Sequence, residues 1–384
     1  MPQNYFDSKN PKSEHYKIKI EFEKLIESSV FHLSESGRHD LFEHPRFWDE
    51  IEKAEKNLGA RLVNMMTAER YIAEYLSEDY KKLSDEEAKQ HDDILHKSIE
   101  SDPVLFKLLK ARAKKKEPDE IDSSDITLNK VYSTIGMVNI QKIIRRMIEN
   151  SMRVGKKEVY GINSDSFLIH VLLIAYYLQS MYDHLPRDLM EELNNYFKNK
   201  KSLYIKRQLY FTGLLHDYGK IILNQGYEKV HEKILMEFKE SENPESFYEI
   251  EKKTIGIDHT DLANVILKKM GLEDAVIEAI YAHHEPIEKG KRFPQLCKLV
   301  FWVNNLFVTT GLKDKTGFWI VNTRRLEDIK KTAEQMDLED LYNIKIIREN
   351  ILETESNINE LLHELKILPP RDKFLIVTSL PFYT

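Results

Sequence analysis

Cysteine, glycine and proline are all scarce in this sequence. Cys297 is the single cysteine, so no disulfide framework can form, which fits a reducing cytoplasm. Only 13 glycines and 12 prolines occur among 384 residues, which leaves few positions at which a helix has to stop. Because Lys, Glu, Leu and Ile are abundant, the composition favours a mostly helical protein over a sheet protein.

Long hydrophobic runs are also missing. The most apolar stretch, residues 167–182, contains His170 and Gln179 and is shorter than a membrane span requires. The first 17 residues are polar and lack the apolar core of a signal peptide. We therefore expect a cytoplasmic protein that makes no contact with the membrane.

A net positive charge is absent as well. The formal net charge is −7, so general nucleic-acid binding is not expected. One basic stretch, residues 107–116, has further basic residues near it at 145–157. A solvated helical face explains this stretch, and a surface that binds a phosphate or a partner is the alternative. The sequence leaves the oligomeric state open.

Apolar residues at helical spacing are present along most of the chain. A chain of this length allows about two to three domains. The pattern predicts four segments, which are a tail with a helical extension of unknown role (1–84), a helical subdomain (85–155), a helical unit that holds the chemistry (156–310) and C-terminal helices with a tail (311–384). Residues 374–377 are predicted to be a short strand or a docked extended segment.

Several residues mark where helices begin and end. Ser84 precedes an acidic triplet, which is a helix-start signal, and either Ser101 or Asp102, which precede Pro103, is expected to cap the next helix. The segment Asp258–Asp261 starts another helix, which Gly271 is expected to end in the left-handed conformation.

The dipeptide His-Asp occurs three times. His39-Asp40 and His91-Asp92 stand in polar surroundings and are expected on the surface. His216-Asp217 instead follows an apolar run, and Gly219, which we expect to break the helix, and Lys220 come after it. An imidazole beside a carboxylate at a buried helix end is costly unless something binds both groups, and a divalent metal is the simplest such ligand.

Four more histidines lie within or at the ends of apolar helical stripes: His170, His259, His283 and His284. One buried histidine is usually a satisfied core residue. Five of them with Asp217 in one unit are costly to bury without a shared partner. If they converge, they offer more ligands than one tetrahedral metal needs, and two ions are conceivable. The remaining histidines are assigned to the surface: His15, His32, His39, His44, His91, His96, His184, His231 and His363.

This order of residues resembles the HD superfamily of helical metal-dependent phosphohydrolases. The closer resemblance is to the HDOD branch, which is associated with bacterial signalling and regulation. Residues 259–286, HTDLANVILKKMGLEDAVIEAIYAHHEP, are similar to the HDOD pattern of a His-led helix, a glycine stop and a helix that ends in His-His. Residues 99–113 and 126–144 resemble the N-terminal helical subdomain of that family. Over about residues 85–310 the resemblance implies an all-α, multi-helix HD-domain bundle with an N-terminal helical subdomain and a helical extension.

The resemblance also implies a divalent metal, with Fe, Mn, Zn and Ni as candidates and one or two ions bound. The ligands that it implies are His170, His216, Asp217, His259, His283 and His284. Lys220 matches a lysine that can meet a substrate phosphate as a point charge. Asp217 and Lys220 are therefore the candidates for a catalytic role.

Asn304 departs from the superfamily, whose last ligand is an Asp in a late apolar helix. An amide oxygen is a neutral, weaker ligand and cannot act as a base on metal-bound water. Residues 290–294 are a degraded form of the Gly-x-Gly-Tyr-Pro signature of the cyclic-dinucleotide phosphodiesterases. These departures put hydrolysis in doubt more than metal binding.

Three functions are compatible with the sequence. We expect a regulatory HDOD-type protein that binds metal, and a nucleotide or a signalling protein as partner, with little or no turnover. The alternative is an active metal-dependent phosphohydrolase or phosphodiesterase that acts on a nucleotide or a cyclic dinucleotide. The third is a helical scaffold in which the histidines are core residues only.

Overall fold

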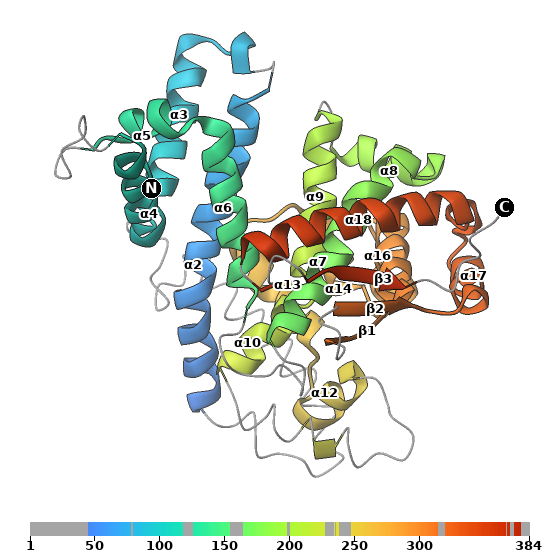
Figure 1. The fold of residues 1–384 in the computed structure, drawn as a ribbon. Coiled ribbons are helices and arrows are strands. Elements are labelled where there is room, and N and C mark those ends of the chain that lie inside the picture. Colours follow the sequence, from blue (N-terminus) through green and yellow to red (C-terminus); the bar gives the residue numbers. More distant parts are fainter. Residues whose placement is uncertain are drawn as a thin grey trace. The chain divides into compact units, whose positions relative to one another are not determined.

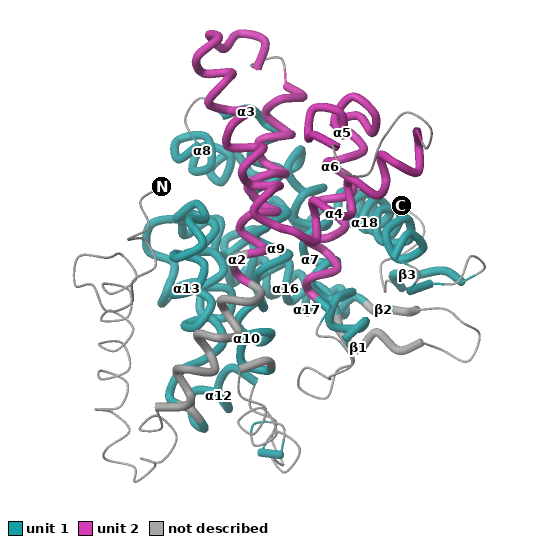
Figure 2. Tube along the Cα trace, turned by 90° about the vertical axis from the view of Figure 1, so that its left-hand side faces the viewer, with its two compact units in different colours: residues 1–54, 153–384 teal, residues 55–152 magenta. Residues whose placement is uncertain are grey.

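The computed structural model describes residues 45–77, 80–117, 126–153, 164–197, 200–226, 234, 236–237, 247–313, 319–365, 367–368 and 372–377. The predictions for the N-terminal tail and for His39-Asp40 lie outside these residues. The chain forms two compact units, one of residues 55–152 and a larger one that holds residues 153–384 (Figure 2). The division into four segments stays a prediction.

The described elements are predominantly helices (Figure 1), which confirms the predicted helical class. No helix in the described ranges is long and apolar enough to span a membrane. In chain order the elements are α2 (Pro45–Tyr75), η2 (Tyr80–Lys82), α3 (Asp85–Glu100), α4 (Pro103–Lys116), α5 (Leu128–Ile135), α6 (Met137–Ser151), α7 (Ser164–Met181), η3 (Tyr182–His184), α8 (Arg187–Tyr196), α9 (Ser202–Leu215), α10 (Tyr218–Gly226), α12 (Phe247–Ile255), α13 (His259–Lys269), α14 (Asp274–Tyr281), α15 (Pro286–Lys289), α16 (Pro294–Leu306), β1 (Phe307–Lys313), β2 (Trp319–Thr323), α17 (Leu326–Gln335), η4 (Glu339–Leu341), α18 (Ile344–Glu364) and β3 (Phe374–Val377).

Side-chain caps confirm the predicted helix starts in the unit of residues 55–152. The Ser84 hydroxyl accepts a hydrogen bond from the backbone N–H of Glu87 at 3.4 Å, and the Glu87 carboxylate accepts one from the Ser84 N–H at 2.9 Å. The Asp102 carboxylate accepts hydrogen bonds from two backbone N–H groups of α4, at 3.0 and 3.1 Å. These bonds satisfy N–H groups that have no partner inside the helix.

His91 is buried, so its assignment to the surface was wrong. Its side chain on α3 is only 6% exposed, and its ring lies edge-on to Tyr71 at 4.7 Å and to Tyr80 at 4.9 Å between centroids. The residues next to His91 in sequence are polar, but on a helix its face is shared with residues four and eight positions later. These are the buried Leu95 and Ile99.

The larger unit is built around α7, which is buried over nearly its whole length. α7 packs against α9 on one side and α18 on another, α9 packs against α14, and α14 packs against α13. The helices that carry or precede the predicted ligands are therefore neighbours in the core of this unit.

A small sheet adds to the predicted helical fold. Strands β1, β2 and β3 form it in that order; β1 and β2 are antiparallel, and β2 and β3 are parallel. The strand expected at residues 374–377 is confirmed as β3, whereas β1 and β2 were not predicted. The available signal was their composition, FVTTGLK and WIVNT, which is rich in β-branched and aromatic residues.

Side chains of α18 cover the outer edge of β3. The Asn359 amide exchanges two hydrogen bonds with the backbone of Phe374, both at 2.8 Å. The Glu355 carboxylate accepts a hydrogen bond from the Ile376 N–H, also at 2.8 Å. An edge strand whose backbone groups are bonded in this way is not free to pair with another chain.

Close contact between α7 and α9 depends on Gly213. A Cβ at this position would lie 2.5 Å from Cα of Ala175 and 2.6 Å from the carbonyl carbon of Ile174. Both atoms belong to the α7 backbone, which cannot move aside as a side chain can. Only glycine therefore allows the two helices to approach so closely.

We expect Gly213→Ala to destabilise the protein, because the added methyl group forces α7 and α9 apart. Overpacking of this kind costs about 1–3 kcal/mol, and backbone contacts place this case toward the upper end. Urea unfolding followed by circular dichroism measures the loss. Ser202→Ala, at an exposed position on the same helix, is the matched control and should change stability by less than about 0.5 kcal/mol. Equal stability of Gly213→Ala and the wild type would contradict the close contact.

Candidate metal centre

His216 and Asp217 lie in the turn between two helices. His216 is the C-cap of α9, and α10 begins at Tyr218. Both side chains are buried, with exposures of 0% and 2%. Gly219 does not break the helix as expected, because it lies inside α10. The expectation was wrong because it treated the glycine as a local signal, whereas its role is tertiary.

Gly219 allows α10 to contact the beginning of α13. A Cβ on Gly219 would overlap the carbonyl oxygen of His259 and lie 2.8 Å from its carbonyl carbon. The absence of a side chain thus lets the backbones meet. This contact sets the separation between Asp217 on one element and His259 on the other.

The predicted start of α13 is confirmed, and a capping box fixes it. The Asp258 carboxylate accepts hydrogen bonds from the N–H groups of Thr260 at 2.7 Å and Asp261 at 3.0 Å, and the Asp261 carboxylate accepts one from the Asp258 N–H at 3.0 Å. His259 is the first residue of the helix and is fully buried. Gly271, with φ of 69°, ends the helix region as predicted.

His283 and His284 lie just beyond α14, so the expectation that this helix ends in His-His was wrong by three residues. α14 ends at Tyr281, and Pro286 begins α15. The residue before a proline is biased away from the helical conformation, which favours an early helix end. The Nδ1 atom of His283 lies 2.7 Å from the Ile280 carbonyl oxygen, and this bond turns the ring inward.

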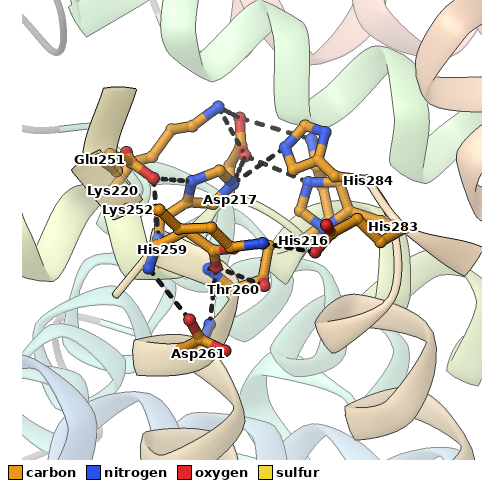
Figure 3. Close-up of polar contacts among 12 residues, drawn as sticks. His216, Asp217, Lys220, Glu251, Lys252, His259, Thr260, Asp261, His283 and His284 are labelled. Carbon is orange, nitrogen blue, oxygen red and sulfur yellow. Dashed lines mark hydrogen bonds and ion pairs between the residues drawn. The ribbon is translucent and has the colours of Figure 1, made fainter. Parts of the chain in front are cut away.

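Six predicted ligands form two overlapping groups that share Asp217. Figure 3 labels all of them except His170. The ligand atoms of each group lie within 4.8 Å of one another. The His170 group consists of His170, His216 and Asp217. The His259 group consists of Asp217, His259, His283 and His284.

The two oxygens of Asp217 face different groups. Oδ2 lies 3.3 Å from Nε2 of His170, and Oδ1 lies 3.3 Å from Nε2 of His259 and 3.7 Å from Nε2 of His283. Within each group two Nε2 atoms also lie close together. The distance is 3.0 Å between those of His170 and His216 and 3.2 Å between those of His259 and His284. The carboxylate therefore stands between two sets of imidazoles and can bridge them.

Three of the imidazoles are held with Nε2 toward Asp217. Nδ1–H of His216 donates to the Gly213 carbonyl at 2.7 Å, and Nδ1–H of His283 donates to the Ile280 carbonyl. Nδ1–H of His259 donates to the Glu251 carboxylate at 2.6 Å. When Nδ1 donates, the lone pair of a neutral ring is on Nε2, which is the arrangement of a metal-binding histidine.

Burial and neighbouring charges set the protonation states. Burial lowers the pKa of His216 to about 3 and lowers the pKa values of His283 and His284 well below the usual value, so these rings are neutral. Burial alone would raise the pKa of Asp217, but the charge of Lys220 and the imidazoles hold it well below its usual value. An ionised carboxylate among neutral imidazoles is a ligand set ready for a cation.

His259 is the exception among the imidazoles. Burial would lower its pKa, but Glu251 on one side and Asp217 on the other outweigh burial and raise the pKa to about 9. Without a metal, His259 therefore carries a proton at neutral pH. A cation bound at its Nε2 has to replace that proton.

Nε2 of His283 is buried and lacks a hydrogen-bond partner in the described part of the chain. Oδ1 of Asp217 lies 3.7 Å from it and has Nζ of Lys220 at 2.9 Å. Orphaned buried polar atoms are rare and costly. Imidazole nitrogens with a carboxylate oxygen are suitable ligands for Zn, Fe, Mn and Ni. The donor set thus fits the metal that the sequence predicted.

Lys220 and Asn304 have different relations to the cluster. Nζ of Lys220 lies 2.9 Å from Asp217, and its side chain, like that of His170, is 14% exposed. His284 is also partly exposed, so solvent reaches a member of each group. Asn304 is half-buried on α16, which packs against α7 and α14, and no described contact joins it to the six ligands. Its role as a ligand stays a prediction.

The sequence did not single out Glu251, which lies on α12 eight residues before His259. Glutamate is common in this chain, and the neighbouring Glu249 is exposed. The nearby apolar residues Ile250 and Ile255 were the only possible signal. Two apolar neighbours are too few to predict that Glu251 lies on the buried face of the helix. Its role depends on how α12 folds back on α13.

Comparison with known proteins supports the resemblance seen in the sequence. Residues 126–286 match the model of the HDOD domain, and this range holds Lys220 and all predicted ligands except Asn304. A search of curated proteins found no match.

Solved structures are similar over most of their length, at low identity. The MmoQ response regulator from Methylococcus capsulatus is 14% identical, with 73% of this chain and 95% of that chain covered and a TM-score of 0.33. A candidate phosphohydrolase from Shewanella amazonensis is 11% identical, with 83% and 98% covered and a TM-score of 0.42. A virulence factor from Campylobacter jejuni is 14% identical, with 77% and 98% covered and a TM-score of 0.32.

We expect Gly219→Ala to impair the metal site, because the added methyl group would push His259 away from Asp217. Metal content after growth in supplemented medium should fall well below that of the wild type, and stability should decrease by about 1–3 kcal/mol as for other overpacked positions. Plasma mass spectrometry and urea unfolding give the two values. Gly271→Ala is a control for backbone strain outside the cluster, since its φ of 69° strains a side chain but no atom lies within 4 Å of the added Cβ; it should lose stability and keep the metal. Wild-type metal content in Gly219→Ala would count against the contact.

Proposed function

On the premise that residues 126–286 are an HDOD domain, we propose that this protein is a regulatory protein that binds one or two divalent metal ions around Asp217 and turns over little or no substrate. The proposal includes a nucleotide or a signalling protein as the partner and the cytoplasm as the compartment. Fe, Mn, Zn and Ni are the candidate ions.

The observation that supports metal binding is an orphaned atom at the centre of the cluster. Nε2 of His283 is buried and has no hydrogen bond in the described part of the chain, and it lies 3.7 Å from Oδ1 of Asp217, whose charge is paired with Lys220. A helical scaffold with histidines as ordinary core residues would leave this cost uncompensated. A cation would receive both atoms as ligands.

The ligand assignment follows from the two groups. His259, His283 and His284 with Asp217 would hold one ion, which satisfies the four positions of a closed tetrahedral site. His170 and His216 would share Asp217 with a second ion. A closed four-ligand site is typical of structural metals, whereas a three-ligand site keeps a position open.

Little or no turnover is proposed because the positions that differ from the superfamily pattern are those expected to be needed for hydrolysis. Asn304 offers an amide where an Asp is expected, and the amide cannot take a proton from water. The cluster is also enclosed, since the exposed side chains at its rim are only 14% accessible. A buried metal whose coordination positions are all filled by protein ligands stabilises the fold.

One contact favours the alternative of a metal-dependent phosphohydrolase. Lys220 reaches the cluster at Asp217 and is partly exposed, so its ammonium group is placed to meet a phosphate that enters from solvent. A bound metal would supply the activated water in such a reaction. His170 would flank the phosphate on the same exposed side.

Purified protein from metal-supplemented growth should contain about one or two equivalents of a divalent metal. His216→Ala and Asp217→Ala should lose most of it, because each removes a ligand of the shared centre. His184→Ala, a histidine outside the cluster, should keep the wild-type content. Plasma mass spectrometry measures the metal, and circular dichroism shows that each variant is folded. Only trace metal in the wild type would sink both the regulatory and the enzymatic proposal.

Hydrolysis of a generic bis-aryl phosphate by the metal-loaded protein should not exceed the rate of the His216→Ala control. Asn304→Asp should raise the rate, because it adds a carboxylate where the superfamily has its last ligand. A wild-type rate far above the control would favour the phosphohydrolase. No effect of Asn304→Asp on either rate or metal content would show that residue 304 is not part of the site.

A further inference from the structure

Helix α12 turns one face toward the histidine cluster, and none of its residues was predicted to take part. Tyr248, Glu251 and Lys252 are spaced i, i+3 and i+4, so they lie on the same face of the helix. Each of them contacts the cluster or the turn that carries His284. The three contacts differ in kind and act on two of the predicted ligands.

Glu251 orients His259 by two hydrogen bonds to one oxygen. Oε2 accepts from Nδ1–H of His259 at 2.6 Å and from the backbone N–H of the same residue at 2.9 Å (Figure 3). Both side chains are 0% exposed, so solvent does not compete for these bonds. The double contact fixes the position of the residue as well as the rotation of its ring, and it leaves only Nε2 to face Asp217.

Tyr248 orients His284 by stacking. Their rings are nearly parallel, at 10°, with centroids 4.6 Å apart. Nε2 of His284 then lies 3.2 Å from Nε2 of His259. Stacking restricts the tilt of the His284 ring. Because the lone pair on a ring nitrogen lies in the ring plane, the stack also sets the plane of that lone pair.

Lys252 links α12 to the turn that follows His284 by ion pairs. Its Nζ lies 2.6 Å from the Glu285 carboxylate and 3.4 Å from the Asp258 carboxylate, which caps α13. Nζ is also 5.3 Å from the centroid of the Tyr248 ring. The same helix is thus bonded to both segments that carry the histidines it orients.

The histidines on the other side of Asp217 are oriented by different elements. His170 projects from the middle of α7, and the ring of His216 is held by the Gly213 carbonyl of its own helix α9. The cluster therefore has two separately supported halves that meet at Asp217.

We propose that α12 is the positioning element of the His259 group, with Glu251 and Tyr248 as positioning residues, and that it sets the metal affinity of that group while leaving the His170 group to other helices. The inference rests on the proposed metal-binding function. Outer carboxylates that hold a metal-binding histidine typically change metal affinity by roughly 10–100-fold when they are removed.

The test measures cobalt or zinc affinity by chelator competition in Glu251→Gln and Tyr248→Leu. Each should weaken binding by roughly 10–100-fold, which is the range for removed outer partners. Glu249→Gln, at an exposed position on the same helix, should bind like the wild type. The loss caused by Glu251→Gln should persist in a His170→Ala background and disappear in a His259→Ala background. Equal losses in both backgrounds, or none in either, would overturn the assignment.

A second measurement separates this inference from metal binding itself. In the metal-free wild type, long-range proton–nitrogen NMR should show a proton on Nδ1 of His259, and Glu251→Gln should shift that nitrogen signal whereas Glu249→Gln should not. An unchanged His259 signal in Glu251→Gln would overturn the positioning role even if metal is bound. A wild type that takes up no metal would refute the proposed function, and the NMR result would then still decide whether Glu251 orients the ring. If Glu251→Gln does not fold, Tyr248→Leu decides the affinity test.

Discussion

The buried carboxylate of Asp217 is the feature on which the larger unit depends. An ion taken out of water costs several kcal/mol unless its surroundings compensate it. Here Lys220 supplies one positive charge at 2.9 Å, and imidazoles from three further segments surround both oxygens. The helices that bear these groups must therefore meet at one point. Compensation of the charge on Asp217 therefore requires these helices to pack together.

Two glycines make that meeting possible. Gly213 lets α9 approach the backbone of α7, and Gly219 lets α10 approach the backbone of α13. In both cases a methyl group would fill the space that the opposing backbone occupies. The positions of His170, His216 and His259 around Asp217 thus depend on residues that have no side chain. A ligand set of this precision is built by the scaffold as much as by the ligands.

As a candidate metal centre, the cluster combines features of a structural and of a reactive site. The His259 group has four ligands and an outer layer on α12, as a closed site does. The His170 group has three ligands and lies beside the partly exposed Lys220. A regulatory protein can use the first without the second. A role for Asn304 as a further ligand of this group stays a prediction.

The sequence by itself determined the helical class, the helix starts at Ser84, at Ser101 or Asp102 and at Asp258–Asp261, and the types of residue that make up the cluster. These features depend on spacing within one or two helical turns, which a linear pattern records. Only the tertiary structure decided that His91 is buried, that Gly219 serves a contact instead of a helix end, and that Glu251 supports His259. Each of these outcomes depends on which backbone lies opposite. The packing of residues far apart in the chain determines which backbone lies opposite, so a local sequence pattern cannot predict it.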